Sequence, residues 1–105
     1  MSEESIFSDI IGFQWDNGNN GKNWQRHRVS DGEAEEVFFN NPLLVFPDVK
    51  HSQKETRQYC LGQTNSGRAL FIAFVVRNGL IRIISARDMN KRERTNYEKT
   101  AQKNS

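Results

Sequence analysis

Runs of apolar residues in the second half of the chain predict a β-meander. The longest run covers residues 69–76, and shorter strand-like runs cover residues 43–46, 56–62 and 80–87. Asn-Gly at 78–79 is the strongest short signal for a two-residue hairpin, and Asn-Ser-Gly at 65–67 marks the preceding turn. Three strands joined by tight turns form an antiparallel sheet, in which residues 69–76 are expected to be central.

Helical signals occur before the meander. Residues 11–15 predict a short strand, after which Asp16 is expected to cap a helix that becomes favourable over residues 22–27. Ser30 and Glu33 have the spacing of a capping box, in which each side chain bonds the other residue's backbone N–H. They predict a second helix that ends before the Asn-Asn-Pro at 40–42.

The chain ends in a third, polar helix. Asn90 is expected to cap it, with Glu93 at the third helical position, and only Tyr97 and Ala101 can pack inward. These elements predict one α+β domain over residues 1–105, a small antiparallel sheet flanked by two N-terminal helices and one C-terminal helix. One sheet face is expected to be covered by the N-terminal helices and the other to stay partly open.

Size and composition exclude several classes of protein. The longest apolar run has eight residues, whereas a membrane-spanning helix needs about 20. The N-terminus has no basic flank before an apolar stretch, and the single cysteine, Cys60, cannot form an intrachain disulfide. We therefore expect a cytoplasmic protein with no membrane contact. His27, His51 and Cys60 lack metal-ligand spacing, so neither a metal nor another cofactor is expected.

The small net charge of +2 conceals an asymmetry along the chain. Residues 1–55 carry 5 Lys/Arg and 10 Asp/Glu, whereas residues 56–105 carry 10 Lys/Arg and 3 Asp/Glu. One interpretation is a positive face in the second half that attracts nucleic acid. The other is that the two halves neutralise each other in the fold.

The strand predicted over residues 80–87 contains the most informative side chains. Arginine is costly to bury, and its planar fork suits phosphate, so Arg82 and Arg87 indicate a site that receives an anion. Regular alternation places Arg82 on the opposite face from Ser85 and Arg87, so they meet only if the strand twists or bulges. Arg57 and Arg68 lie on or beside neighbouring strands and are expected to converge with them.

Three other side chains have two interpretations each. His27 could transfer protons, or it could interact with the dipole at its helix C-terminus. His51 lies in a polar loop and is expected to be a bystander. Tyr97 could contact a base or a phosphate, or it could anchor the last helix to the sheet.

Several segments together resemble a known family. They are residues 13–16, 23–30, 35–39, 57–62, 67–70, 81–87 and 93–98. In order and spacing they resemble the BrnT family, which are toxins of type II toxin–antitoxin systems. Residues 82–87 are the most specific segment, and Asn23 with His27 supports it. Arg28 departs from the family pattern, which often has glycine after the histidine. Residues 1–10 and 99–105 lie outside the resemblance and are expected to be flexible ends.

The resemblance implies a RelE-like fold and a ribonuclease that works without a metal. It implies that a BrnA-like antitoxin wraps the toxin, and that operator DNA is bound only through the antitoxin. On this reading RNA is the substrate. Arg57, Arg82 and Arg87 would hold phosphate, Ser85 would position it and His27 would transfer protons. Further RNA contacts would come from Arg68, Lys91, Arg92, Arg94 and Tyr97. The alternatives are a non-catalytic antitoxin-binding co-repressor and, third, a direct DNA-binding protein.

Overall fold

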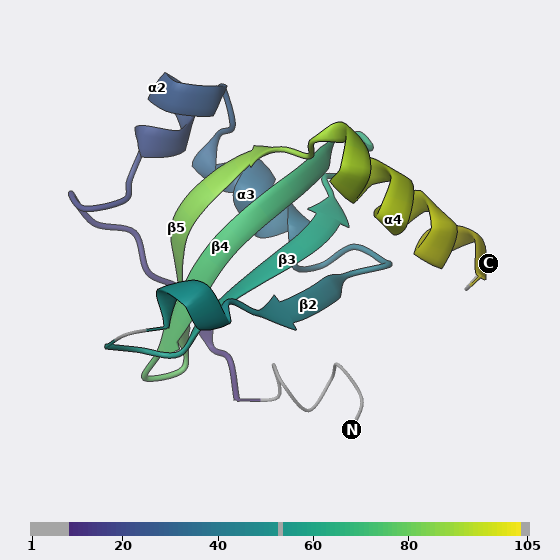
Figure 1. Cartoon of the computed structure of the whole chain (residues 1–105). Coiled ribbons are helices and arrows are strands. Elements are labelled where there is room, and N and C mark those ends of the chain that lie inside the picture. Colours follow the sequence, from purple (N-terminus) through teal and green to yellow (C-terminus); the bar gives the residue numbers. More distant parts are fainter. Residues whose placement is uncertain (1–8, 53, 104–105) are drawn as a thin grey trace.

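The computed structural model describes residues 9–52 and 54–103, and within them five strands form one sheet (Figure 1). The strand order is β1-β5-β4-β3-β2. The strands are β1 (Gly12–Phe13), β2 (Leu44–Pro47), β3 (Arg57–Gln63), β4 (Ala69–Arg77) and β5 (Leu80–Asp88). The predicted α+β meander is confirmed. The sheet is mixed, however, because β1 pairs with β5 in parallel.

Three α-helices and a short 3-10 turn accompany the sheet in the described residues. They are α2 (Lys22–His27), α3 (Asp31–Val37), η1 (Val49–His51) and α4 (Lys91–Lys103). The predicted capping box of α3 is present, since Glu33 N–H donates to Ser30 Oγ and Ser30 N–H donates to Glu33 Oε1, both at 3.0 Å. Asn90 and Glu93 make the same reciprocal pair before α4, at 2.9 and 2.8 Å.

The expected cap at Asp16 is wrong. The residue before α2 is Gly21, which has a φ of 72° and contributes no side-chain bond. Asp16 instead organises the turn that precedes the helix, because its carboxylate accepts from Gly18 N–H at 2.7 Å. The Asn/Gly-rich residues 17–20 favour turn over helix, which delays the helix until residue 22.

Arg28 closes α2 in the left-handed conformation, with a φ of 57°. Glycine is the residue that best tolerates this region, because it has no Cβ to clash with the backbone. The position where this chain departs from the family pattern is therefore one where the backbone itself favours glycine.

The main core lies between the sheet and α3, on the face that is turned away from the viewer in Figure 1. Its largest side chains come from the two central strands and are completely buried, Leu70, Ile72 and Phe74 from β4 and Ile83 from β5. Cys60 is also buried here, and burial raises the pKa of its thiol. The apolar strands of the meander are thus explained by their contact with the N-terminal helices.

A second, smaller core fixes α4 over one end of the other face. It consists of Leu61, Met89 and Tyr97, with partly buried neighbours that include Phe71. α4 runs to Lys103, so residues 99–103 of the expected flexible C-terminal end are helical. Of the expected flexible ends, residues 1–8 and 104–105 lie outside the described residues. No described helix is long and apolar enough to cross a bilayer.

Candidate functional site

A bulge in β5 brings three candidate side chains to one face of the sheet. The pairing of β5 with β4 shifts by one residue, so that Ile84 has no partner on β4. Without the bulge, Arg82 would point to the opposite face from Ser85 and Arg87. With it, all three point away from α3, while Ile83 and Ala86 stay in the main core.

The strand pairing adds Arg57 to the same face. Direct cross-strand partners point to the same side of a sheet. The pairing of β3, β4 and β5 therefore gives three rows, which are Arg57–Val75–Arg82, Tyr59–Ala73–Ser85 and Leu61–Phe71–Arg87. We call this side the arginine face. It faces the viewer in Figure 1, with α3 behind the sheet.

An aromatic column crosses the arginine face. The rings of Phe46 and Tyr59 stack with their centroids 5.1 Å apart, and Tyr59 and Phe71 stack at 5.2 Å. The guanidinium of Arg87 lies 4.1 Å from the centroid of Phe71, within cation–π range. The column limits the side chain of Arg87 to a narrow range of positions beside the central row.

Every strand arginine of the described residues, and Arg68 just before β4, has its own carboxylate. Arg87 is held by Glu93 in a bidentate pair at 2.8 and 3.0 Å, and Arg82 donates to Asp16 at 2.7 Å. The other pairs are Arg57–Asp48, Arg68–Asp88, Arg68–Glu33 and Arg77–Glu55. Four of these pairs join an acid of residues 1–55 to a base of residues 56–105. Of the two interpretations of the charge asymmetry, the structure therefore supports mutual neutralisation of the two halves and not an unpaired cationic face.

Among these arginines, Arg57 has the fewest hydrogen bonds to its guanidinium. Its Nε lies 3.4 Å from Asp48 Oδ2, but the geometry is not that of a hydrogen bond, and this buried atom has no hydrogen-bond partner. Within the described residues the guanidinium of Arg57 makes no hydrogen bond, whereas those of Arg82 and Arg87 do. The Ser85 hydroxyl, two strands away, likewise has no hydrogen-bond partner among the described residues. The Arg57 guanidinium and the Ser85 hydroxyl therefore keep hydrogen-bonding capacity that no described residue uses.

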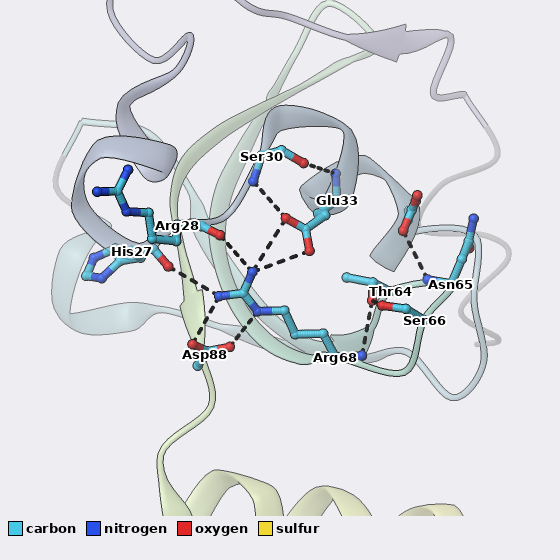
Figure 2. A network of polar contacts seen from close by, with 10 residues as sticks. His27, Arg28, Ser30, Glu33, Thr64, Asn65, Ser66, Arg68 and Asp88 are labelled. Atoms are coloured by element: carbon cyan, nitrogen blue, oxygen red, sulfur yellow. Dashed lines mark hydrogen bonds and ion pairs between the residues drawn. The ribbon is translucent and has the colours of Figure 1, made fainter.

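Arg68 does not join the arginine face. Its guanidinium donates to the backbone carbonyls of Arg28 at 2.7 Å and His27 at 3.2 Å, and to the carboxylates of Asp88 and Glu33 (Figure 2). It thereby satisfies the C-terminal carbonyls of α2 and ties that helix to α3 and β5. We call Arg68, Asp88, Glu33 and these two carbonyls the Arg68 cluster.

The Arg68 cluster also locates His27, whose carbonyl belongs to it. Arg68 precedes β4 and Val75 lies near its end, about 20 Å away at the rise of an extended strand. His27 is therefore at the opposite end of the sheet from Arg57, and the structure does not bring it to the arginine face.

Acid is expected to weaken the Arg68 cluster. The Arg68 guanidinium holds the pKa of Asp88 below its usual range, and the Ser30 backbone N–H together with Arg68 lowers the pKa of Glu33. Such carboxyls bind protons more tightly in the unfolded chain. Their stabilisation is therefore present near neutral pH and is lost as the pH falls below about 4. Thermal unfolding followed from about pH 7 to about pH 3 should show a falling Tm.

The matched variants for this pH prediction are Arg68→Gln and Arg26→Gln. Arg68→Gln should have a lower Tm near neutral pH and a flatter fall in acid, because the carboxyl pKa values return toward their usual range. Arg26 is an exposed residue of α2, and its variant should keep the wild-type pH dependence. An unchanged pH dependence in Arg68→Gln would contradict the assignment.

Tyr97 is an anchor in this structure. It is 6% exposed, and its hydroxyl donates to the Pro42 carbonyl at 2.6 Å. Burial raises the pKa of its phenol. Of the two interpretations made from the sequence, the structure supports the attachment of α4 to the sheet, and little of the ring is left for RNA.

Replacing Tyr97 by phenylalanine is expected to lower the free energy of unfolding by about 0.5–1.5 kcal/mol, because the partly buried hydrogen bond to the Pro42 carbonyl is lost. Urea unfolding measures this loss. The ring still fills the small core, so RNA cleavage by the folded variant should equal that of the wild type. If Tyr97→Phe lost RNA cleavage while its free energy of unfolding stayed unchanged, the interpretation that the Tyr97 hydroxyl contacts RNA would be supported instead.

The three basic residues at the start of α4, Lys91, Arg92 and Arg94, are exposed. Arg94 makes one long bond to the Met89 carbonyl at 3.5 Å, and within residues 9–52 and 54–103 the side chains of Lys91 and Arg92 make no hydrogen bond. Because α4 begins next to Arg87, these charges continue from the arginine face along the helix.

His51 was expected to be a bystander, but the structure places it beside Arg57. A pocket of about 220 Å³ opens on the arginine face, lined by His51, Lys54, Glu55, Arg57, Val75 and Ile84. His51 Nδ1 lies 3.0 Å from Asp48 Oδ1. The signal in the sequence was the spacing of Asp48 and His51, three residues apart, which lets one helical turn join them.

The model of a family described as "Ribonuclease toxin, BrnT, of type II toxin-antitoxin system" matches residues 15–93, most of the chain. No curated protein matches the chain closely. The matched residues include the four strand arginines, Arg68 and the pocket that contains His51.

Proposed function

This chain belongs to the BrnT family of ribonuclease toxins of type II toxin–antitoxin systems. We propose that it is itself an endoribonuclease and that the arginine face is its active site. The reaction is attack by an RNA 2′-hydroxyl on the adjacent 3′-phosphate, which leaves a 2′,3′-cyclic phosphate and a 5′-hydroxyl. The observation that carries this proposal is the bulge at Ile84, which puts Arg82, Ser85 and Arg87 on one face with Arg57.

The arginines supply the charge stabilisation that this chemistry needs. Negative charge grows on the phosphoryl oxygens in the transition state, and fixed guanidinium groups offset it without reorganisation. Arg57 has free donors, while Arg82 must exchange Asp16 for phosphate. Asp16 is exposed to solvent, which screens its ion pair with Arg82, so the exchange costs little. Ser85, in the central row, donates to the same phosphate.

RNA reaches this face along α4. Lys91, Arg92 and Arg94 attract the phosphate backbone. This contribution to binding weakens as the salt concentration rises, because releasing counterions from the RNA then becomes less favourable. Arg87 stands between this helix and the central row, where the Phe71 ring and Glu93 fix its position. The bound RNA therefore runs from the start of α4 toward Arg57.

The test is cleavage of RNA by the purified chain in the presence of a metal chelator. Cleavage with 2′,3′-cyclic phosphate ends supports the proposal, and replacing the nucleotide 5′ to the cut by a 2′-deoxynucleotide should abolish it. Cleavage of the fully deoxy-substituted strand would exclude the 2′-hydroxyl as nucleophile. Induction of the chain alone in a bacterial host should arrest growth and degrade RNA.

Toxins of this class are held by an antitoxin. We propose that the partner is BrnA-like, that it covers the arginine face, and that operator DNA is bound only through it. The site of action is the cytoplasm, where the RNA substrate is made. Co-purification of the chain with the product of the adjoining reading frame tests the partner.

One observation favours a second function, that of a non-catalytic antitoxin-binding co-repressor. Three of the four strand arginines, and Arg68 just before β4, are hydrogen-bonded to carboxylates, as expected of groups that stabilise a fold. Growth that is unaffected by induction of the folded chain, together with operator binding by its complex, would favour this function over the enzyme.

A further inference from the structure

The pocket beside Arg57 holds a histidine–carboxylate pair that the mechanism above does not use. We propose that His51 is the general base of the cleavage reaction, that Asp48 orients it, and that the pocket takes the phosphate whose neighbouring 2′-hydroxyl attacks. This inference rests on the proposed ribonuclease function and adds the proton-transfer group to it.

The orientation of His51 follows from its contacts with Asp48. Nδ1 lies 3.0 Å from one carboxylate oxygen and 3.1 Å from the other. An ionised carboxylate only accepts hydrogen bonds, so the proton in this contact belongs to Nδ1. Nε2 of the neutral ring then carries a lone pair. The side chain is 55% exposed, so this lone pair can reach a bound ligand.

A network of short hydrogen bonds keeps the histidine pair next to Arg57. Asp48 N–H donates to the Arg57 carbonyl at 2.8 Å, and Arg57 N–H donates to Ser52 Oγ at 2.9 Å. The Ser52 hydroxyl in turn donates to the Asp48 carbonyl at 2.7 Å. The turn that carries the base is therefore tied to the first residue of β3, which carries the phosphate-binding guanidinium.

The charges around the pocket suit a phosphodiester. Arg57 and Lys54 line it and are positive, and the donors of Arg57 are not hydrogen-bonded. Glu55 also lines it, but its carboxylate is taken up by Arg77. Val75 and Ile84 form an apolar floor. A phosphate group fits these lining residues, because the planar fork of the Arg57 guanidinium can donate to two of its oxygens.

The proton balance of the step is complete. His51 Nε2 takes the proton of the 2′-hydroxyl while the bond from O2′ to phosphorus forms. The bond from phosphorus to O5′ breaks, and O5′ takes one proton from water. The imidazolium, stabilised by Asp48, returns its proton to water, so that no proton is gained or lost overall.

The experiment compares His51→Asn with the wild type in RNA cleavage at several pH values. An asparagine amide can still donate to Asp48, which preserves the turn, but it cannot accept a proton. The kcat is expected to fall by about 10²–10⁴-fold, and the limb of the pH–rate profile that reports the base should disappear. Lys54, Glu55 and Arg57 also line the pocket, and Asp48 contacts His51 and Arg57 from the same turn. His51→Gln and Lys54→Gln are therefore run beside it to assign that limb.

Asp48 is a positioning residue, and its test separates kcat from KM. Asp48→Asn presents an amide donor to Nδ1, which places the ring proton on Nε2 and removes the lone pair. The kcat should fall while KM stays near the wild-type value. Val49→Ala, an exposed change in the same 3-10 turn, should leave both constants unchanged.

The failure of this inference can be told from the failure of the proposed function. If the wild-type chain does not cleave RNA, the ribonuclease proposal itself fails. If it cleaves and His51→Asn and His51→Gln, both melting like the wild type, cleave equally fast with the same pH profile, only the role of His51 is overturned. If the limb of the pH–rate profile that reports the base disappeared in His27→Gln instead, the general base would be His27, at the other end of the sheet.

Discussion

Replacing Arg57 by alanine is expected to slow RNA cleavage by about 10²–10³-fold, the usual result of removing one fixed donor from a developing oxyanion. Arg57 should be the most sensitive of the strand arginines, because it makes no hydrogen bond that a phosphate would have to replace. It also begins the strand to which the His51 turn is tied. Single-turnover cleavage of a short RNA, with the variant in excess, measures the chemical step directly.

The controls for Arg57→Ala separate local chemistry from general charge. Arg26→Ala removes the same charge from an exposed position on α2 and should cleave at the wild-type rate. Arg82→Ala should fall in between, since Arg82 already donates to Asp16 at 2.7 Å and must leave it to bind phosphate. Cleavage by Arg57→Ala equal to that by Arg26→Ala would remove Arg57 from the site.

The largest loss of stability is expected from Phe74→Ala, about 3–5 kcal/mol. Phe74 is completely buried at the centre of β4, and its ring packs edge-on against Phe38 at a centroid distance of 5.2 Å. Alanine leaves a cavity between the sheet and α3 that neither can close without shifting the strand. This loss is a large part of the roughly 5–15 kcal/mol that holds a domain folded.

Urea unfolding, with the slope and the midpoint both fitted, measures the effect of Phe74→Ala. Phe39→Ala is the matched control, because it removes the same ring from a position that is 77% exposed and should cost little. Equal losses in the two variants would mean that the main core does not depend on the central strand in the way the burial pattern indicates.

Local signals predicted most of the secondary structure. Both capping boxes and the Asn-Gly hairpin depend on residues a few positions apart, and the structure confirms each of them. Asp16 was misread because its carboxylate serves the turn at Gly18 and the Arg82 ion pair, and the second partner is 66 residues away. A cap and a distant ion pair look alike in a sequence.

The candidate site depended on long-range pairing, which a sequence pattern does not reveal. Straight alternation along residues 80–87 separates Arg82 from Ser85 and Arg87, and only the register with β4 shows the bulge that reunites them. The carboxylate partners of the arginines were likewise hidden, since most of them come from the first half of the chain. Of the two interpretations of the charge asymmetry, their pairing supports mutual neutralisation of the two halves. The roles of these residues in RNA cleavage remain predictions.

The two outer strands of the sheet are its shortest, with two residues in β1 and four in β2. β2 also ends in Pro47, which has no backbone N–H to offer. β1 and β2 themselves therefore offer few backbone groups to another polypeptide. We expect an inhibitor of this toxin to bind mainly through side chains and not by extending the sheet from β1 or β2.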